Sequence, residues 1–362
     1  MSQSIPEKPI SVAMMTSPTV FQNHGGLAIQ MRETHAALRE LGIDAELVNP
    51  MDVDLTRFDV IHAFSAINGC QRIIEHAKTI GKVAIGSPLL QPFWTAGYGR
   101  RARLIDQVAS RLLGWHVKTE YRHLQSFLQK ADHLIALGDV ERRSIHDAFL
   151  VPDAKISVIP NGIPARFFRA GPDLFCREFG IEPGFVLIVG EVSPYKNQLT
   201  LANALKDCGR QLVVIGPLNK APADYVAALQ QLPFVHLTGR IDYADPLLSS
   251  AYAAAGVFCL PSLSEVMPLS VLEALAGNTP VVMTERHCMD ASRFGSCIRY
   301  VEPQNASAIR SALEQQFAFA ETGECRRVVE DLTWTAVATR IAKVYRDTLA
   351  AASHDLNDGR NT

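Results

Sequence analysis

Short apolar runs alternate with helical patterns along most of the chain. Apolar runs bounded by Gly, Pro or charged residues are typical of buried strands, whereas apolar residues three and four positions apart indicate helices. The runs predict strands at 10–17, 44–49, 59–64, 82–87, 133–137, 155–160, 185–189, 211–216, 235–239, 256–260 and 280–284. Helical patterns stand at 27–41, 98–130, 268–276, 305–320 and 334–352. This βαβ rhythm predicts an α/β protein with doubly wound, Rossmann-like parallel sheets.

One strand, loop and helix contain the most suggestive polar residues. The run 257–260 leads into a polar loop with Glu265, and a helix then begins at Pro268 and ends before Gly277. Open α/β sheets bind ligands at the carboxyl ends of their strands, where this loop is expected. On a helical wheel Glu273 lies opposite the apolar stripe, so Glu273 need not be buried.

The start of this helix is a candidate anion site. Its first backbone amides, near Met267, Leu269 and Ser270, suit a ligand such as a phosphate. A carboxylate such as Glu265 is a poor phosphate ligand, but it accepts hydrogen bonds from sugar hydroxyls. By spacing alone, Glu265 and Glu273 also fit solvated surface residues.

These residues resemble the E-x7-E signature of the retaining glycosyltransferase family 4. The resemblance continues in order through 158–163, 187–196 and Trp334, and it is strong over about 155 to 350. It implies the GT-B fold, in which two Rossmann-like domains face each other across a cleft. The implied domains are an acceptor-side domain at 1–165, onto which helix 336–352 packs back, and a nucleotide-sugar domain at 166–335, followed by a flexible tail at 353–362.

The resemblance also implies a role for each site residue. Glu273 is expected to bind ribose hydroxyls and Glu265 the donor sugar. Lys196 and the helix-start residues are expected to bind the departing diphosphate, and Gly25 and Gly26 lie in a turn that the family uses near it. The candidate donor-binding residues are therefore Gly25, Gly26, Lys196, Arg240, Glu265, Met267, Pro268, Leu269, Ser270 and Glu273, with Glu265 and Lys196 as the catalytic pair.

The implied reaction is a retaining, metal-independent sugar transfer without a cofactor. The donor is a nucleotide diphosphate sugar, and the acceptor is a saccharide, a lipid-linked molecule or another compound. No metal site is expected, because backbone amides and a lysine can stabilise the charge that develops on the leaving phosphate.

Two departures from the family pattern keep alternatives open. Glu191 stands where the family usually has an arginine, and a carboxylate near the diphosphate would repel it by on the order of 1 kcal/mol or more. Either Glu191 points away, or Arg240 compensates, or donor binding is weakened. The stretch 86–94 lacks the acceptor-side histidine of many members, and His62, inside a strand, reads as a packed or hydrogen-bonded residue.

The alternative to an active transferase is a GT-B protein that lost catalysis and acts as a binding or regulatory partner. A nucleotide-sugar epimerase or hydrolase of the same fold is a third reading, because fold alone does not choose among these functions.

Charge matters locally rather than overall. With 35 basic against 37 acidic residues, the chain has no general field that would attract nucleic acid. Residues 98–130 nevertheless carry seven positive charges against two negative ones. If Gly114 does not break the helix, five cations share an arc of about 100°, flanked by an apolar stripe. The cations are Arg100, Arg103, Arg111, Lys118 and Arg122, and the stripe is Leu104, Val108, Leu112 and Trp115.

This basic face has two readings. A solvated face beside a core stripe explains it, and contact with an anionic membrane or acceptor is the alternative. The stretch 161–184, rich in Pro and Gly, is in turn expected to be a linker with few apolar contacts.

Cysteine usage and hydropathy bear on the compartment. The seven Cys form no metal-binding spacing, so free thiols in a reducing compartment are expected. No run reaches 18 apolar residues and the first nine residues are largely polar, which predicts neither a membrane span nor a signal peptide. The expected location is the cytoplasm, with peripheral contact at the inner membrane face as the alternative.

Overall fold

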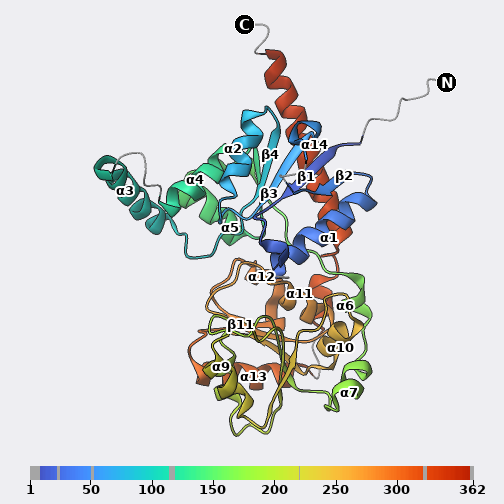
Figure 1. Cartoon of the computed structure of the whole chain (residues 1–362). Coiled ribbons are helices and arrows are strands. Elements are labelled where there is room, and N and C mark those ends of the chain that lie inside the picture. The colour runs from blue at the N-terminus through green and yellow to red at the C-terminus, as the bar shows by residue number, and fades with distance from the viewer. Residues whose placement is uncertain are drawn as a thin grey trace, which may run out of the picture. The chain divides into compact units, whose positions relative to one another are not determined.

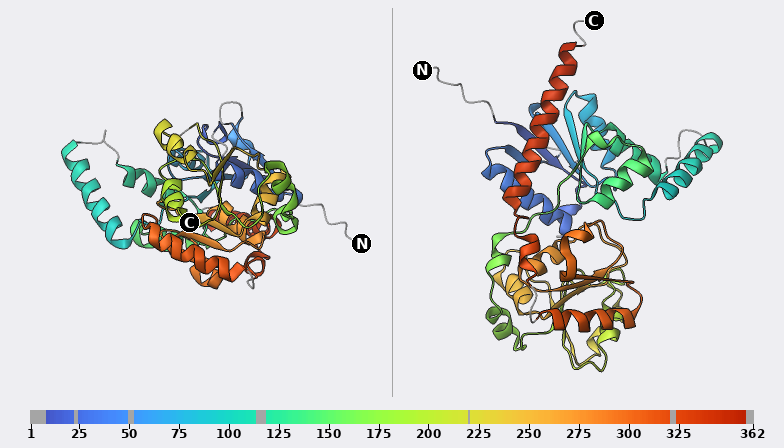
Figure 2. Two further views of the ribbon diagram at one scale, coloured as in Figure 1. Left: turned by 90° about the horizontal axis from the view of Figure 1, so that it is seen from below. Right: turned by 180° about the vertical axis from the view of Figure 1, so that it is seen from behind.

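The chain folds into two compact units, each built on its own parallel sheet (Figures 1 and 2). The computed structural model describes residues 9–22, 25–49, 53–113, 119–219, 221–320 and 324–358. Unit 1 comprises Met1–Gly162 with Trp334–Thr362, and unit 2 comprises Ile163–Thr333. Each sheet has six strands, which confirms the predicted pair of doubly wound parallel sheets.

The sheet of unit 1 has the order β2-β1-β3-β4-β5-β6. Its strands are β1 (Ser11–Met15), β2 (Asp44–Leu47), β3 (Val60–Phe64), β4 (Val83–Ser87), β5 (His133–Ala136) and β6 (Ile156–Val158). Every residue of β1, β3 and β4 is buried, as expected for strands that helices cover on both faces. Successive strands are added on opposite sides of β1: β2 lies on one side, and β3 to β6 follow on the other. The loops after β1 and β3 therefore diverge at this point.

The helices of unit 1 cover both faces of this sheet. They are α1 (Gly26–Glu40), α2 (Gln71–Thr79), α3 (Ala96–Leu113), α4 (Glu120–Lys130), α5 (Asp139–Arg143) and α14 (Trp334–Asp358), with short turns η1 (Val20–Gln22), η2 (Leu55–Arg57), η4 (Ser144–Ala148) and η5 (Asp153–Lys155). α14 contacts α1 and extends to Asp358, beyond the predicted end at 352.

His62 connects three elements of unit 1. Its Nδ1 lies 2.7 Å from the hydroxyl of Tyr345 on α14, and its Nε2 lies 2.9 Å from that of Ser87 on β4. Complete burial lowers the pKa of His62 to about 3, so the ring is neutral at physiological pH. His62 is thus a buried, hydrogen-bonded residue, as the sequence predicts.

Glu141 is a fully buried carboxylate that fixes the loop after β4. It accepts hydrogen bonds from the backbone N–H of Leu90 and of Leu137, both at 2.7 Å. Burial raises the pKa of the Glu141 carboxyl from its ordinary 4.5 to about 7, against the opposite effect of these amides. The loop it holds includes Leu89, whose φ of 57° lies in the left-handed region.

This raised pKa makes the stability of unit 1 depend on pH. A group whose pKa is higher in the folded state stabilises the fold fully below its unfolded pKa and loses that contribution as the pH rises through the folded one. For Glu141 the window is about 4.5 to 7. We therefore expect the free energy of unfolding to decline across this window, and Glu141→Gln, which cannot ionise, to remove that decline.

Urea unfolding at about pH 5 and about pH 8 measures this effect. The matched control is Glu40→Gln, because Glu40 is an exposed residue of unit 1. If the unfolding free energies of the parent and Glu141→Gln differed by the same amount at both pH values, the raised pKa of Glu141 would be contradicted.

The sheet of unit 2 has the order β12-β11-β10-β7-β8-β9. Its strands are β7 (Val186–Val189), β8 (Leu212–Ile215), β9 (Val235–Gly239), β10 (Val257–Leu260), β11 (Val281–Thr284) and β12 (Ile298–Val301). β12, an edge strand that is only partly buried, was not predicted, because its four residues include Arg299 and Tyr300 and form no apolar run. In this sheet the strand order changes side between the adjacent parallel strands β7 and β10, with β8 and β9 on one side and β11 and β12 on the other.

The helices of unit 2 are α6 (Ala165–Arg169), α7 (Asp173–Phe179), α8 (Gln198–Leu205), α9 (Ala223–Gln230), α10 (Pro246–Ala254), α11 (Leu269–Ala276), α12 (Ala291–Phe294) and α13 (Ala306–Ala320), with turns η6 (Gly295–Cys297) and η7 (Arg326–Val329). Two of these helices, α6 and α7, lie in the predicted linker. Phe167 and Phe175 are completely buried, and Phe167 packs against Tyr252 of α10. The expectation of a linker with few apolar contacts is therefore wrong, because these side chains belong to the core of unit 2.

The basic stretch 98–130 forms two helices rather than one. α3 ends at Leu113 and α4 begins at Glu120, while Gly114, Trp115 and Lys118 lie outside the described residues. Leu104 and Val108 are 62% and 55% exposed. The reading of these two residues as part of a core stripe is therefore wrong.

All seven Cys lie within the described residues, and all are free thiols, as predicted. No helix in the described part of the chain has both the length and the apolar character needed to cross a bilayer.

Candidate functional site

A polar site of unit 2 lies where the strand order of its sheet changes side, between β7 and β10. Lys196 stands in the loop after β7 and Glu265 in the loop after β10, and these strands are neighbours. Lys196 Nζ lies 2.6 Å from Glu265 Oε1, a distance typical of a strong charge-assisted hydrogen bond. Their side chains are only 24% and 11% exposed. The topology thus brings together the two residues predicted to form the catalytic pair.

Hydrogen bonds between loops hold this ion pair in place. The Tyr195 hydroxyl donates to the carbonyl of Ser264 at 2.6 Å, and the N–H of Leu263 donates to the carbonyl of Tyr195 at 2.9 Å. The N–H of Glu265 donates to the carbonyl of Arg286, at 2.9 Å, in the loop after β11. Burial, and then the charge of Glu265, raise the pKa of Tyr195, so its hydroxyl stays a donor.

Tyr195 and Arg286 were not predicted as site residues. In the sequence only their positions pointed to the site. Tyr195 directly precedes Lys196, and Arg286 follows the predicted strand 280–284. Arg286 also forms an ion pair with Glu302 at 2.7 Å, which fixes the loop that supports Glu265.

Asn197 fixes the other side of the lysine. Its backbone is left-handed, with φ of 63°, a conformation that asparagine tolerates better than most residues. Its side-chain amide donates to the carbonyl of Pro261 at 3.1 Å and to that of Pro303. The residue after Lys196 is therefore tied to the loop that carries Glu265.

Two glycines bring β8 close to the loop of Lys196. Gly190 has a φ of 152°, and a Cβ atom placed on Gly216 would lie 1.9 Å from the carbonyl oxygen of Gly190. No side chain fits between these two backbones, so Gly216 is required for the course of the loop.

Glu273 is buried, which corrects the expectation that it need not be. It is 3% exposed and accepts a hydrogen bond from the Tyr252 hydroxyl at 2.8 Å. The helical wheel failed because α6, α10 and η7 also contact α11, so that its polar side is covered too. Burial, and then the charge of Glu273, raise the pKa of Tyr252 well above its ordinary value.

The predicted helix start lies next to Glu265. α11 begins at Leu269, directly after Pro268, and Met267 and Leu269 are each 8% exposed. Ser270 is half-buried. The first turn of α11 is thus largely enclosed by protein.

Arg240 and Glu191 differ in position and in exposure. Arg240 follows β9, two strands from β7, which places it on the order of 10 Å to the side. It forms an exposed ion pair with Asp242 at 3.5 Å. Glu191 is half-buried, and its carbonyl accepts a hydrogen bond from Gln198 at 3.0 Å.

Gly25 and Gly26 belong to unit 1, at the start of α1. Gly25 has φ of −82°, and a Cβ atom on either glycine would meet nothing within 4 Å. Neither glycine is therefore required by the fold itself. The residues before them in the predicted loop, Asn23 and His24, lie outside the described residues.

Comparisons with known proteins bear on the family and the fold. Residues 183–318 match the family described as glycosyl transferases group 1. The chain is 24% identical over 272 residues to the MMP alpha-(1->4)-mannosyltransferase of Mycolicibacterium hassiacum. The aligned residues cover 69% of this chain and 63% of that protein. The aligned part of the chain thus spans less than two thirds of that relative.

Solved structures share the fold of most of the chain. Sucrose-phosphate synthase from Thermosynechococcus elongatus superposes with a TM-score of 0.71 at 19% identity, over 94% of this chain and 100% of that one. The Anabaena protein HepE in complex with UDP-glucose gives a TM-score of 0.63 at 14% identity, over 93% and 99%. At such identities the likeness establishes the fold, which is GT-B, as predicted.

Proposed function

Residues 183–318 belong to the glycosyl transferases group 1 family, and on that premise we propose that the protein transfers a sugar from a nucleotide diphosphate sugar to an acceptor. In the proposed reaction the bond between the anomeric carbon and the phosphate oxygen breaks with retention of configuration. The anomeric carbon forms a new bond to an acceptor hydroxyl, whose proton passes to the departing nucleoside diphosphate. The acceptor is a saccharide or a lipid-linked molecule.

The ion pair of Lys196 and Glu265 is the observation that carries this proposal. Negative charge grows on the leaving diphosphate as the sugar departs, and a fixed ammonium group stabilises that charge. Before the donor binds, each member of the pair neutralises the other, which offsets the cost of keeping charges at 24% and 11% exposure. On donor binding, Lys196 turns to the diphosphate and Glu265 accepts hydrogen bonds from sugar hydroxyls.

The remaining donor contacts follow from the resemblance. The resemblance assigns the ribose hydroxyls to Glu273. The first amides of α11, near Met267, Leu269 and Ser270, support the diphosphate. Gly25 and Gly26 leave open space in unit 1 that would admit a phosphate group close to the backbone.

A donor screen tests the function. Purified protein is heated with UDP-, GDP- and ADP-sugars, and nucleoside diphosphate release is followed without and with candidate acceptors. A rise in Tm with one donor, together with slow release, supports the transferase. A rise in Tm without any release favours a catalytically lost binding or regulatory protein, and no rise with any donor would refute a nucleotide-sugar site.

Glu191 offers a separate prediction. If its carboxylate faces the diphosphate, replacing the negative charge by a positive one in Glu191→Arg should tighten nucleoside diphosphate binding roughly tenfold at low salt. The gain should shrink as salt is added, because screening weakens exposed electrostatic contacts.

Calorimetric titration with UDP, GDP and ADP at low and high salt measures the change. Glu178→Arg is the matched control, because Glu178 is an exposed residue of α7 and undergoes the same charge change. Equal affinity of Glu191→Arg and the parent would mean that Glu191 points away from the ligand.

A further inference from the structure

α3 exposes a stripe of large apolar side chains. Tyr98, Leu104, Ile105 and Val108 are 49%, 62%, 64% and 55% exposed. At 100° per residue these four fall within a sector of about 120° on the outer face of the helix. Phe93, in the turn before α3, is 51% exposed and contacts Tyr98 edge to face. A contiguous exposed apolar surface of this kind marks a binding face.

The opposite face of α3 is firmly attached to unit 1. A Cβ atom on Gly99 would lie 2.5 Å from the backbone of Ala148, so α3 and η4 are in direct backbone contact. Arg103 donates to the Tyr121 hydroxyl at 3.1 Å and to the carbonyl of Ala148 at 3.2 Å. Asp106 pairs with Arg122 of α4 at 3.2 Å. The outward direction of the apolar stripe is therefore set by the fold.

The same outer face is positively charged. Arg100, Arg101 and Arg111 are exposed, and within the described part of the chain none of them has an ion-pair partner. Asp106, the one acidic residue of α3, is buried against α4 and neutralised by Arg122. α3 therefore combines three uncompensated cations with an apolar stripe, and it stands away from the sheet of its unit (Figures 1 and 2).

A groove of about 520 Å³ lies at the base of α3, on the side where this helix meets η4. Arg100 and Arg103 line one side, and His146, Asp147, Leu150 and Pro152 line the other. Leu150 adds a further apolar side chain that is 58% exposed.

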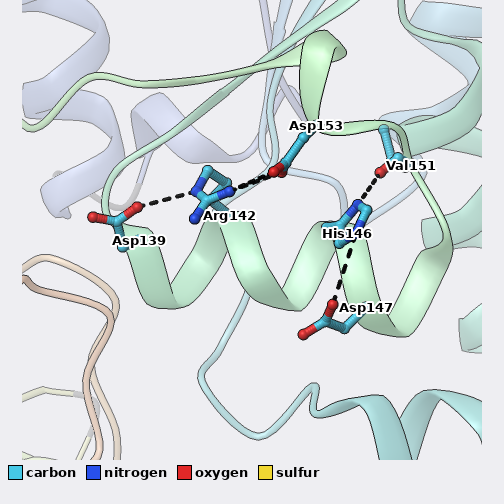
Figure 3. A network of polar contacts seen from close by, with 6 residues as sticks. All are labelled: Asp139, Arg142, His146, Asp147, Val151 and Asp153. Atoms are coloured by element: carbon cyan, nitrogen blue, oxygen red, sulfur yellow. Dashed lines mark hydrogen bonds and ion pairs between the residues drawn. The ribbon is translucent and has the colours of Figure 1, made fainter.

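Polar contacts stiffen the far wall of this groove (Figure 3). Arg142 bridges Asp139 and Asp153 at 3.0 and 2.7 Å, and His146 Nδ1 donates to the carbonyl of Val151 at 2.8 Å. The chain from 142 to 153 therefore presents Leu150 on a fixed support, next to the cations of α3.

We propose that this α3 surface docks unit 1 on an anionic lipid bilayer. Apolar side chains of an interfacial helix enter the boundary between headgroups and acyl chains, while arginines extend their guanidinium groups to the lipid phosphates. Charge complementarity selects this partner. A second copy of the chain is disfavoured, because a twofold contact would bring two sets of the same three cations together. The docking is independent of the transfer reaction, so it can be tested without a known donor or acceptor.

Cosedimentation with vesicles tests the proposal. Vesicles of phosphatidylcholine with about 30 mol% phosphatidylglycerol are compared with pure phosphatidylcholine at low and high salt. The parent should pellet only with the anionic vesicles, and less at high salt. Arg100→Gln, Arg101→Gln and Arg111→Gln together should weaken partitioning roughly a hundredfold. Leu104→Gln, Ile105→Gln and Val108→Gln together should weaken it at least about tenfold.

Matched variants separate this surface from general effects. Arg72, Arg299 and Arg346 are exposed arginines elsewhere on the chain, and changing all three to Gln removes the same charge. This control should pellet like the parent, and all variants should unfold at the parent Tm, because the replaced apolar residues are more than half exposed.

Three outcomes overturn the proposal. The parent stays in the supernatant with anionic vesicles, or the control loses as much binding as the α3 variants. In the third, the parent self-associates in sedimentation without lipid and the Leu104, Ile105 and Val108 variant does not, which assigns the face to a second copy.

Discussion

Lys196→Ala is expected to lower kcat by about 10² to 10³-fold, the usual cost of removing one fixed group that stabilises a developing charge. Glu265→Ala should produce a loss of similar size, because Glu265 is proposed to hold the donor sugar in the reactive position. The geometry makes the two losses dependent, since Lys196 Nζ and Glu265 Oε1 lie 2.6 Å apart. The double variant should therefore be little worse than either single one.

Steady-state kinetics of both single variants and the double variant, with the donor found in the screen, provide the measurement. Lys206→Ala is the matched control, because Lys206 is an exposed lysine of the same unit. Each single variant leaves a charge without its partner, so Tm must be measured alongside the rates. Turnover at the parent rate in both single variants, with the fold intact, would show that the site lies elsewhere.

Gly216→Ala is expected to destabilise unit 2 by more than about 3 kcal/mol, at the upper end of the range for inserting a methyl group into a packed site. The reason is backbone contact, because the new Cβ atom would lie 1.9 Å from the Gly190 carbonyl oxygen and neither strand end can rotate away as a side chain would. The N–H of Gly216 is also fixed, since it donates to the carbonyl of Gly239 at 2.9 Å.

Thermal and urea unfolding measure this loss, and nucleoside diphosphate binding reports on the loop of Lys196. The matched control is Gly171→Ala in the same unit, where a Cβ atom would meet nothing within 4 Å and φ is not in the left-handed region. If Gly216→Ala were as stable as Gly171→Ala, the close approach of the two loops would be wrong.

The sequence by itself determined eleven of the twelve strands, all but β12, and the general position of the loop with the candidate chemistry. Apolar runs such as 185–189 and 257–260 are too short for helices and too apolar for surface strands, so local composition alone predicts buried parallel strands. The spacing of Glu265 and Glu273 and the resemblance that it carries located the loop with the candidate chemistry. These signals are local, and they need no knowledge of which strands are neighbours.

Only the tertiary structure decided which side chains meet and which are buried. Lys196 and Glu265 are 69 residues apart, and they pair because the strand order places β7 beside β10. A helical wheel describes one helix without its surroundings. The wheel predicted that Glu273 need not be buried, although other helices cover it. It also assigned Leu104 to a core stripe, although Leu104 is 62% exposed among the described residues. Burial depends on what packs against a helix, and that is fixed by contacts between segments far apart in sequence.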